Sequence, residues 1–390
     1  MIRVLVLTSR FPDRLRPNLG NFIERQTLEL AARPGVGVEV VAPLGHAPFF
    51  LSKAGRALEG VPRRETWKGL GVHRPRFAQL PYLPALRPAA LAHALASVAA
   101  EIRRDFPFDI VSAEFSWPDG PAAVALGRLF GVPVVIKARG MDFEHRVAAR
   151  ATRGQTLAAA RAAQGLLAVS GELKEKMAAA GLTSDSIAVH YPGVDSDMFR
   201  PVDPAAAKSR LGVDGPLLIA VGNLTPEKRQ HLAVEALALI DDATLIIVGS
   251  GPEAAALGER ARRLGVSGRL RLLGSVPHPL LPALFGAADV TLHCSAVEGF
   301  GNVRMESLAC GTPVVSTSAG EAARLIDHPE YGRVVAPDPA AIAAAVHQLL
   351  TSPPPRHAVR EAVRSFTWAR NAAQLEDHLR AAVSAAGRFP

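Results

Sequence analysis

Residues 289–317 read as a strand, a loop, a short helix and a second strand in immediate succession. The apolar run at 289–293 is typical of a buried strand, and a loop of mostly small residues carrying Glu298 follows it. A helix is expected to begin near Asn302 and to stop at Gly311, before another strand at 313–317. This succession predicts an α/β unit with the loop after the carboxyl end of a strand, where open parallel sheets bind ligands.

Two carboxylates in this stretch, Glu298 and Glu306, are expected to face one crevice. Eight residues on a continuous helix would separate them by about 80°, but the intervening loop removes this constraint. The first N–H groups of the helix would face the same crevice and suit an anionic group such as a phosphate. The ligand-binding backbone groups are expected at Phe300, Gly301, Asn302 and Val303. The alternative is an ordinary loop charge and a solvated helix position.

The strand–helix alternation occurs twice along the chain. Apolar runs at 2–8, 36–42, 108–113, 132–137 and 165–170 predict one parallel sheet, and runs at 217–222, 243–248 and 270–274 predict the beginning of a second. Residues 192–204 are rich in Pro and Asp and predict a linker. A chain of 390 residues is also long for one core. We therefore expect domains at 1–195 and 196–365, followed by a final segment at 366–390.

Candidate site residues in the first half follow predicted strands. Gly20 precedes a predicted helix at 23–32, so its loop can bring backbone N–H groups to a ligand, although a plain turn has the same appearance. Glu114 follows the strand at 108–113, and Arg139 and Asp142 follow the strand at 132–137. Glu114 and Asp142 are candidates for acid–base catalysis or for orienting an acceptor, whereas Arg139, which is always cationic, can bind a phosphate or an acceptor oxygen. Simple ion pairs within the loops are the alternative.

In the second half, the loop after the strand at 217–222 carries Asn223, Lys228 and Arg229. A lysine between a strand and a helix can hold a phosphate, although an isolated lysine is more often a solvated surface residue. The chain's two cysteines, Cys294 and Cys310, have no zinc-site spacing, and no Asp-x-Asp pair follows a predicted strand. No metal site is predicted.

Glu-Gly-Phe-Gly at 298–301, the second carboxylate at Glu306 and Gly-Thr-Pro-Val at 311–314 resemble the nucleotide-sugar site of the family 4 glycosyltransferases. The resemblance implies the GT-B fold, in which two Rossmann-like doubly wound domains face an interdomain cleft. It also implies an acceptor-side first domain, a donor-binding second domain and a last helix that crosses back to the first. The activity implied is retaining transfer of a hexosyl group from a UDP- or GDP-sugar to a hydroxyl acceptor, without a metal or other cofactor.

By resemblance, Glu298 holds the donor sugar, Lys228 the diphosphate and Glu306 the ribose, while Gly20 closes over the phosphates. The chain departs from the family pattern at several positions. His is frequent where Glu114 and Arg139 stand, and Arg is usual at Asn223, so Arg229 would have to restore that charge. These departures leave open a nucleotide-sugar-binding protein without catalysis, or a GT-B epimerase or hydrolase.

The positive charge is confined to the first half. Residues 1–200 contain 26 Lys and Arg against 18 Asp and Glu, whereas the later residues are balanced. This half can meet an anionic membrane surface or a lipid-linked or growing glycan acceptor. No nucleic-acid-binding motif accompanies the charge. A membrane-facing or acceptor-side surface is predicted from Phe49, Phe50 and Leu51 together with Arg56, Arg63, Arg64, Arg74 and Arg76. A cytoplasmic location, at most peripheral to the membrane, is expected because no signal peptide or membrane span is recognisable.

Overall fold

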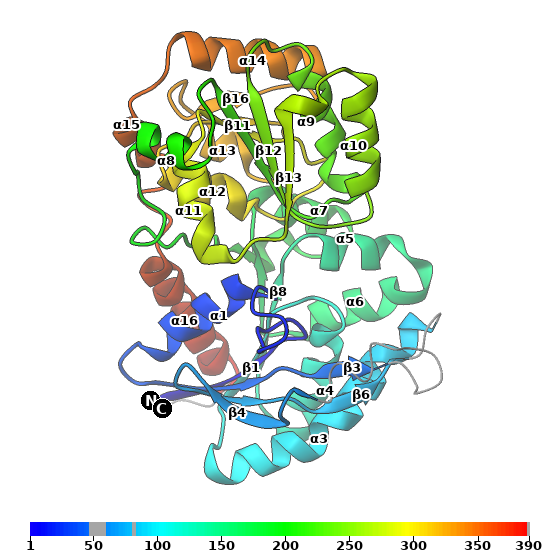
Figure 1. Ribbon diagram of the computed structural model, residues 1–390. Helices are drawn as coiled ribbons and strands as arrows, with labels where there is room; N and C mark the ends of the chain where they lie inside the picture. The colour runs from blue at the N-terminus through cyan, green and yellow to red at the C-terminus, as the bar shows by residue number, and fades with distance from the viewer. Residues whose placement is uncertain (47–59, 80–82, 388–390) are drawn as a thin grey trace. The chain divides into compact units, whose positions relative to one another are not determined.

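The computed structural model describes residues 1–46, 60–79 and 83–387 (Figure 1). Internal contacts divide the chain into two compact units. The first unit comprises residues 1–193 and the C-terminal segment from Trp368, and the second comprises residues 194–367. Each unit is an α/β structure built on a parallel sheet, as the sequence predicted, and each is described by itself.

The first unit contains an eight-stranded sheet in the order β10-β9-β8-β7-β1-β2-β5-β4. All neighbours pair in parallel except β4, which runs antiparallel to β5 at the edge. The strands are β1 (Ile2–Leu7), β2 (Val36–Val41), β4 (Arg64–Trp67), β5 (Leu70–His73), β7 (Ile110–Ala113), β8 (Val134–Ala138), β9 (Gly165–Ala168) and β10 (Ile187–Val189). A separate two-stranded sheet pairs β3 (Leu44–His46) with β6 (Arg76–Ala78).

The helices of the first unit follow its strands, and the last one returns from the far end of the chain. They are α1 (Asn21–Ala31), α3 (Arg87–Asp105), α4 (Asp119–Phe130), α5 (Met141–Ala148), α6 (Arg150–Ala162), α7 (Gly171–Ala179) and α16 (Trp368–Ala385). Helix α16 packs beside α1 (Figure 1). Its Leu375 and Leu379 join one apolar core with the alternating residues Ile2, Val4 and Val6 of β1. The amphipathic pattern of α16 therefore completes the core of the first unit.

The second unit contains a six-stranded parallel sheet in the order β13-β12-β11-β14-β15-β16. The strands are β11 (Leu217–Val221), β12 (Thr244–Val248), β13 (Leu270–Gly274), β14 (Val290–His293), β15 (Val314–Ser316) and β16 (Gly332–Val334). The helices are α8 (Pro204–Arg210), α9 (Gln230–Leu237), α10 (Ala254–Arg263), α11 (Leu281–Ala287), α12 (Asn302–Ala309), α13 (Ala322–Leu325), α14 (Pro339–Thr351) and α15 (Arg356–Glu361).

The chain crosses between the units twice, after Gly193 and after Thr367. The two crossing segments are paired, because the Val194 N–H donates a 2.8 Å hydrogen bond to the carbonyl of Phe366. Helix α15 ends at Glu361, and Phe366 belongs to the crossing segment that follows it.

Several elements of the first unit were not predicted. Strands β3, β4, β5 and β6 have only three or four residues each and lie in a Pro- and Arg-rich stretch, where the alternation is too short to recognise. Four residues of the predicted membrane-facing or acceptor-side surface, Phe49, Phe50, Leu51 and Arg56, lie outside the described residues. The placement of Arg74 on that surface is wrong, because its side chain is fully buried and paired with Glu65. Within the described ranges, no helix is long and apolar enough to cross a membrane.

Candidate active site

Glu298 lies in the loop after β14, where two basic side chains contact its carboxylate. Lys228 Nζ donates a 2.5 Å hydrogen bond to Glu298 Oε1, and His293 Nε2 lies 3.1 Å from the same oxygen. Lys228 closes the 3-10 turn Pro226–Lys228 after β11, and His293 is the last residue of β14. Because β11 and β14 are neighbours in the sheet, their carboxyl ends bring all three groups together.

This environment sets the charge of each group. Burial by itself raises the pKa of Glu298, but the contacts with His293 and Lys228 hold that pKa well below its ordinary value. Burial, with a smaller contribution from Arg304, lowers the pKa of His293. Near neutral pH Glu298 is therefore an ionised carboxylate, and His293 is a neutral imidazole whose Nε2–H donates to it. Among the described residues, His293 Nδ1 has no hydrogen-bond partner.

Helix α12 begins immediately after this loop. Gly301 precedes it in the left-handed conformation, with φ of 93°, and an added Cβ there would collide with the guanidinium group of Arg304. Arg304 is fully buried and donates hydrogen bonds to the carbonyl of Ala319 at 2.8 Å and to the carbonyl of Phe300. Arg304 therefore fixes the loop from which the first N–H groups of α12 emerge, and such groups have no partner within their own helix.

Glu306 projects from α12 and has a separate partner. Its Oε1 lies 2.7 Å from His278 Nε2, and the His278 ring packs edge-on against Phe199, with ring centroids 5.2 Å apart. Burial lowers the pKa of His278, but the hydrogen bond and charge of Glu306 outweigh this and raise it. The carboxylate expected to hold a ribose is thus paired with a histidine in this structure.

The loop after β11 also carries Asn223 and Arg229. Asn223 is exposed, and its carbonyl accepts a 3.0 Å hydrogen bond from the Thr225 N–H. Arg229 adopts the left-handed conformation, with φ of 48° and ψ of 38°. A side chain in this conformation costs roughly 1–2 kcal/mol relative to glycine. Glycine adopts this conformation without that cost.

Gly20 ends the loop that leads from β1 into α1. Its φ of 71° is left-handed, and an added Cβ would overlap the carbonyl of Arg10. Its own carbonyl accepts hydrogen bonds from the N–H groups of Ile23, at 2.9 Å, and Glu24, at 3.0 Å. Glycine is therefore required at the start of α1, whether or not this loop binds a ligand.

Glu114 and Arg139 form a buried ion pair in the first unit. Arg139 Nη2 contacts Glu114 Oε2, and Arg139 Nε donates a 2.9 Å hydrogen bond to the carbonyl of Glu114. Their side chains are 1% and 8% exposed, respectively. The guanidinium also lies over the ring of Phe22, 4.9 Å from its centroid. This ion pair therefore holds the loops after β7 and β8 together. The sequence predicted the two residues as separate candidates.

Asp142 and Asp119 are buried carboxylates beside this pair. Asp142 accepts hydrogen bonds from the Ser116 N–H at 2.7 Å and the Arg139 N–H at 2.8 Å, while burial raises its pKa. Asp119 accepts a 2.8 Å hydrogen bond from the Ser9 N–H, and burial raises its pKa to about 7. Asp142 therefore bridges the loops after β7 and β8, while Asp119 joins the segment after β7 to the end of β1.

Sequence reasoning did not assign several side chains that complete these contacts. The sequence predicts His293 only as the last residue of a strand. A histidine that ends an apolar strand next to a candidate loop was the available signal for it. Unassigned residues that contact the predicted ones include Gln26, His278, His293 and Arg304.

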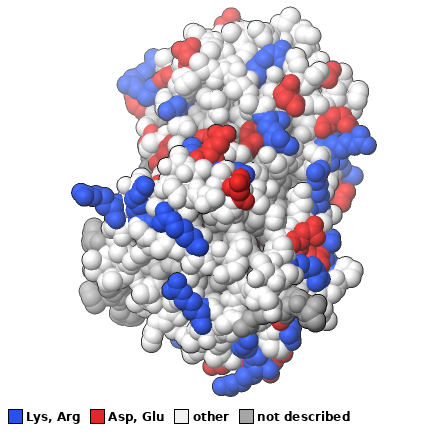
Figure 2. All heavy atoms as spheres, turned by 180° about the vertical axis from the view of Figure 1, so that it is seen from behind, with Lys and Arg blue, Asp and Glu red and all other residues white. Residues whose placement is uncertain are grey.

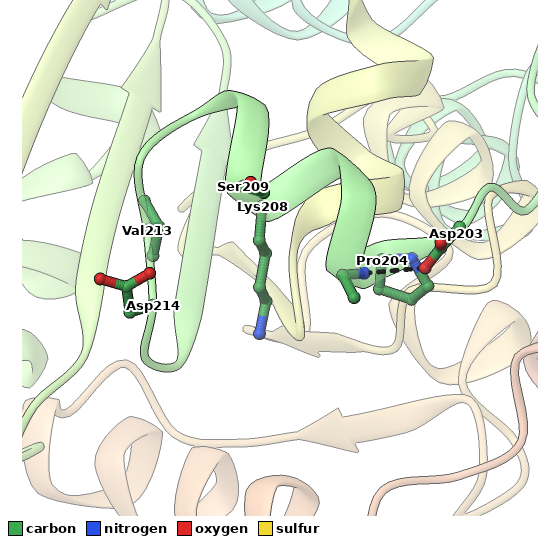
Figure 3. A pocket seen from close by; sticks show the side chains of 7 residues that line it. Asp203, Pro204, Lys208, Ser209, Val213 and Asp214 are labelled. Carbon is green, nitrogen blue, oxygen red and sulfur yellow. Dashed lines mark hydrogen bonds between the residues drawn. The ribbon is translucent and has the colours of Figure 1, made fainter.

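Two surface hollows lie away from these groups. One hollow, of about 500 Å³, lies beside α8, and its lining includes Lys208 and Asp214 (Figure 3). Another, of about 830 Å³, lies in the first unit between β2, β5 and α3 and includes Glu39 and His73 in its lining. None of the predicted catalytic or donor-binding residues lines either hollow, but Arg63, Arg64 and Arg76 of the predicted acceptor-side surface line the second one. In the described part of the chain, no three His, Cys, Asp or Glu side chains are grouped as a metal site requires.

Two family models match consecutive parts of the chain. The model described as Glycosyltransferase Family 4 matches residues 19–198, and the model described as Glycosyl transferases group 1 matches residues 203–366. The chain is 28% identical to a putative teichuronic acid biosynthesis glycosyltransferase of Bacillus subtilis, over 96% of this chain and 97% of that protein. It is 33% identical to a D-inositol 3-phosphate glycosyltransferase of Thermobispora bispora, and this match spans only half of each protein.

Solved structures share the fold at low sequence identity. The Anabaena protein HepE, crystallised in complex with UDP, has a TM-score of 0.75 at 21% identity, covering 97% of this chain and all of that one. Sucrose-phosphate synthase of Thermosynechococcus elongatus has a TM-score of 0.78 at 21% identity, covering 99% of this chain and all of that one. These likenesses show the GT-B fold that the resemblance implied. The two family models, which together match residues 19–198 and 203–366, show that the chain belongs to the family 4 glycosyltransferases.

Proposed function

We propose that this glycosyltransferase moves a hexosyl group from a UDP- or GDP-sugar to a hydroxyl acceptor, with retention of anomeric configuration. The contact of Glu298 with Lys228 and His293, beside the amino end of α12, carries the proposal. An ionised carboxylate suits the hydroxyls of a sugar. A lysine cation and helix N–H groups suit a diphosphate. The cluster therefore offers partners for both parts of a nucleotide sugar.

In the proposed reaction, the bond between the anomeric carbon and the diphosphate oxygen breaks as the acceptor oxygen bonds to the same face of that carbon. The acceptor proton passes to the departing diphosphate. Lys228 and the N–H groups of residues 300–303 stabilise the charge that develops on the leaving group. Lys228 shifts from Glu298 to the diphosphate when the donor binds, which frees Glu298 to accept hydrogen bonds from sugar hydroxyls.

The remaining predicted residues take positioning roles in this scheme. Glu306 exchanges part of its contact with His278 for the ribose hydroxyls, and Asn223 and Arg229 lie beside the diphosphate. In the first unit, Gly20 supplies a loop over the phosphates. The Glu114–Arg139 pair and Asp142 shape the acceptor side. Because Lys228 and the helix supply the positive potential, we expect transfer to survive dialysis against a metal chelator. Loss of activity restored by a divalent cation would contradict this part.

A lipid-linked or growing polysaccharide is the acceptor we propose, used at the cytoplasmic face of a membrane by a peripherally bound enzyme. The teichuronic acid relative supports a polysaccharide product. The excess of Lys and Arg lies in residues 1–200, and Figure 2 shows Lys and Arg side chains on one face, some of them apart from Asp and Glu and some beside them. We expect the protein to co-sediment with vesicles containing anionic lipid at low salt. Binding that ignores lipid charge would contradict the membrane part of the proposal.

The nucleotide can be identified by thermal unfolding in the presence of UDP, GDP, ADP and their hexose conjugates. A ligand that binds only the native state raises the apparent stability by mass action. We expect a shift with one nucleotide family, and transfer from the matching sugar donor should give a product with the donor's anomeric configuration by NMR. A folded sample that responds to none of these ligands, or a product of inverted configuration, would contradict the proposal.

A further inference from the structure

A buried lysine that the scheme above does not use lies beside the Glu114–Arg139 pair. Lys137 belongs to β8 and is only 1% exposed. Its Nζ donates a 2.7 Å hydrogen bond to Gln26 Oε1 and lies 2.7 Å from His190 Nδ1. Both direct partners are uncharged groups. Burial lowers the pKa of Lys137 well below its ordinary value, and a buried amino group is unfavourable unless hydrogen bonds replace the lost water, so a lysine at this position requires an explanation.

Gln26 links Lys137 to the ion pair. Its Nε2 donates a 3.0 Å hydrogen bond to Glu114 Oε1, while its Oε1 accepts from Lys137 and, at 3.4 Å, from Arg139 Nη2. Because both Nε2 and Oε1 of the Gln26 amide are hydrogen-bonded, the amide has one orientation. The donation from Lys137 therefore sets which way the Gln26 amide faces, and the Gln26 amide holds one oxygen of the Glu114 carboxylate.

His190 links Lys137 to the segments that cross between the units. His190 Nε2 donates a 2.9 Å hydrogen bond to the carbonyl of Asn371 in α16, which leaves Nδ1 as the acceptor for Lys137. Asn371 Nδ2 donates a 2.6 Å hydrogen bond to the carbonyl of Tyr191. His190 and Tyr191 precede the first crossing, and Asn371 follows the second. Lys137 is thus connected to the ion pair through Gln26 and to both crossing segments through His190.

We propose that Lys137 is a positioning residue that holds the Glu114–Arg139 pair in place through Gln26 and joins it to the two crossings through His190. The inference rests on the proposed function, because the pair is taken to shape the acceptor side of the reaction. A shift of the crossing segments then reaches the pair through three consecutive side-chain hydrogen bonds, from His190 to Lys137 to Gln26 to Glu114.

The test compares Lys137→Met, which keeps an unbranched side chain but removes the amino group, with the control Arg103→Met. Arg103 is a partly buried cation of the same unit that donates a 2.9 Å hydrogen bond to the carbonyl of Phe108 and does not touch the pair. We expect Lys137→Met to lower kcat about tenfold or more and to leave nucleotide affinity within about twofold, since small misplacements of reacting groups have large effects. Arg103→Met should leave kcat within about twofold.

Gln26→Leu removes the next hydrogen bonds in this series, those of Gln26 with Lys137 and Glu114. If these hydrogen bonds act together, Gln26→Leu lowers kcat as Lys137→Met does, and the double variant is no slower than the slower single variant. Effects that multiply, or a Lys137→Met enzyme as active as Arg103→Met, would overturn the inference. If Lys137→Met does not fold, the kcat of Gln26→Leu is compared with that of Arg103→Met instead. A Gln26→Leu enzyme as active as Arg103→Met would then overturn the inference.

Amide hydrogen exchange supplies a readout that does not depend on activity. In Lys137→Met, peptides covering 139–142 and 190–193 should exchange faster than in the wild type, whereas Arg103→Met should leave them unchanged. Unaltered exchange at both segments contradicts the link. A wild-type protein that shows no transfer contradicts the proposed function instead, while the exchange experiment still decides whether Lys137 joins these segments.

Discussion

The guanidinium group of Arg139 and the carboxylate of Glu114 are each other's partners in a buried ion pair. Both residues stand where the family pattern often has histidine, and the sequence presented them as two separate departures. Either charge alone would be buried without compensation. We therefore interpret the two departures from histidine as one compensating change. The pair also explains why Arg139 is a poor candidate for gripping a phosphate directly, because its Nε and one Nη already bind Glu114.

Breaking this pair from one side should destabilise the protein strongly. Glu114→Ala leaves the Arg139 guanidinium uncompensated, and we expect the free energy of unfolding to fall by about 3–5 kcal/mol. Replacing both residues by His should cost less than Glu114→Ala, because no lone charge remains. Denaturant unfolding of the two variants measures this. A double variant less stable than Glu114→Ala would show that the two positions are not a compensating exchange.

The stability of the protein should depend on pH through Asp119. Burial raises the pKa of Asp119 from its ordinary value of 3.8 to about 7, so the folded state holds its proton more tightly than the unfolded chain. Its stabilising effect is complete below pH 3.8 and is lost as the pH rises through 7. Asp119→Asn removes this titration. The variant should therefore gain stability relative to the wild type between pH 5 and pH 8.

The size of this gain is bounded by the pKa difference. At 1.36 kcal/mol per pKa unit, the full effect of Asp119 is about 4 kcal/mol, and the part between pH 5 and pH 8 is smaller. Chemical unfolding of the wild type and Asp119→Asn at both pH values gives the comparison. A stability difference that stays constant over this range contradicts the raised pKa.

Arg229→Gly should separate backbone strain from ligand binding. Arg229 has a φ of 48°, and glycine relieves the strain of a left-handed side chain, so we expect a gain of about 1 kcal/mol in unfolding free energy. If Arg229 also supplies the charge missing at Asn223, the Kd for the nucleotide diphosphate should rise about tenfold, as for loss of one charge-assisted hydrogen bond. Calorimetry and thermal unfolding report the two effects separately. Unchanged nucleotide affinity would remove Arg229 from the donor site.

The His278–Glu306 pair should stabilise the second unit more at acidic than at alkaline pH. Glu306 raises the pKa of His278 above its ordinary value of 6.5. The stabilisation is therefore complete below pH 6.5 and is lost as the pH rises through the folded-state pKa. Because both side chains are partly exposed, we expect Glu306→Gln to cost only about 1 kcal/mol at pH 5.5 and less at pH 9. An equal cost at both values would contradict the pairing.

The sequence predicted the two sheets because their strands are short, continuously apolar and separated by helical periodicity. The run IRVLVL became β1, and its residues are nearly all buried. It did not predict β3 to β6, whose three- and four-residue strands carry too little alternation to distinguish them from loops. It also did not place Lys137, because a lysine inside an apolar strand has no visible partner until Gln26 and His190, far away in sequence, are brought beside it.

The site shows the same division between local and distant information. The loop carrying Glu298 and the helix carrying Glu306 were predicted from the spacing of residues in one short segment. The ion pair with Lys228 joins residues 70 positions apart, and sequence spacing does not indicate which cation meets which carboxylate. The family resemblance assigns Glu306 to a ribose, but neither it nor the spacing indicates the contact of Glu306 with His278.

The central claim, that the carboxylate of Glu298 acts on the donor sugar, is tested most directly by the kcat of Glu298→Gln at saturating donor and acceptor. The matched control is Glu259→Gln, which removes an exposed carboxylate paired with Arg262 in the same unit. We predict that Glu298→Gln lowers kcat by about 100-fold or more, with nucleotide affinity within a few-fold of wild type and Glu259→Gln unaffected. A folded Glu298→Gln enzyme with near-wild-type kcat would contradict the account.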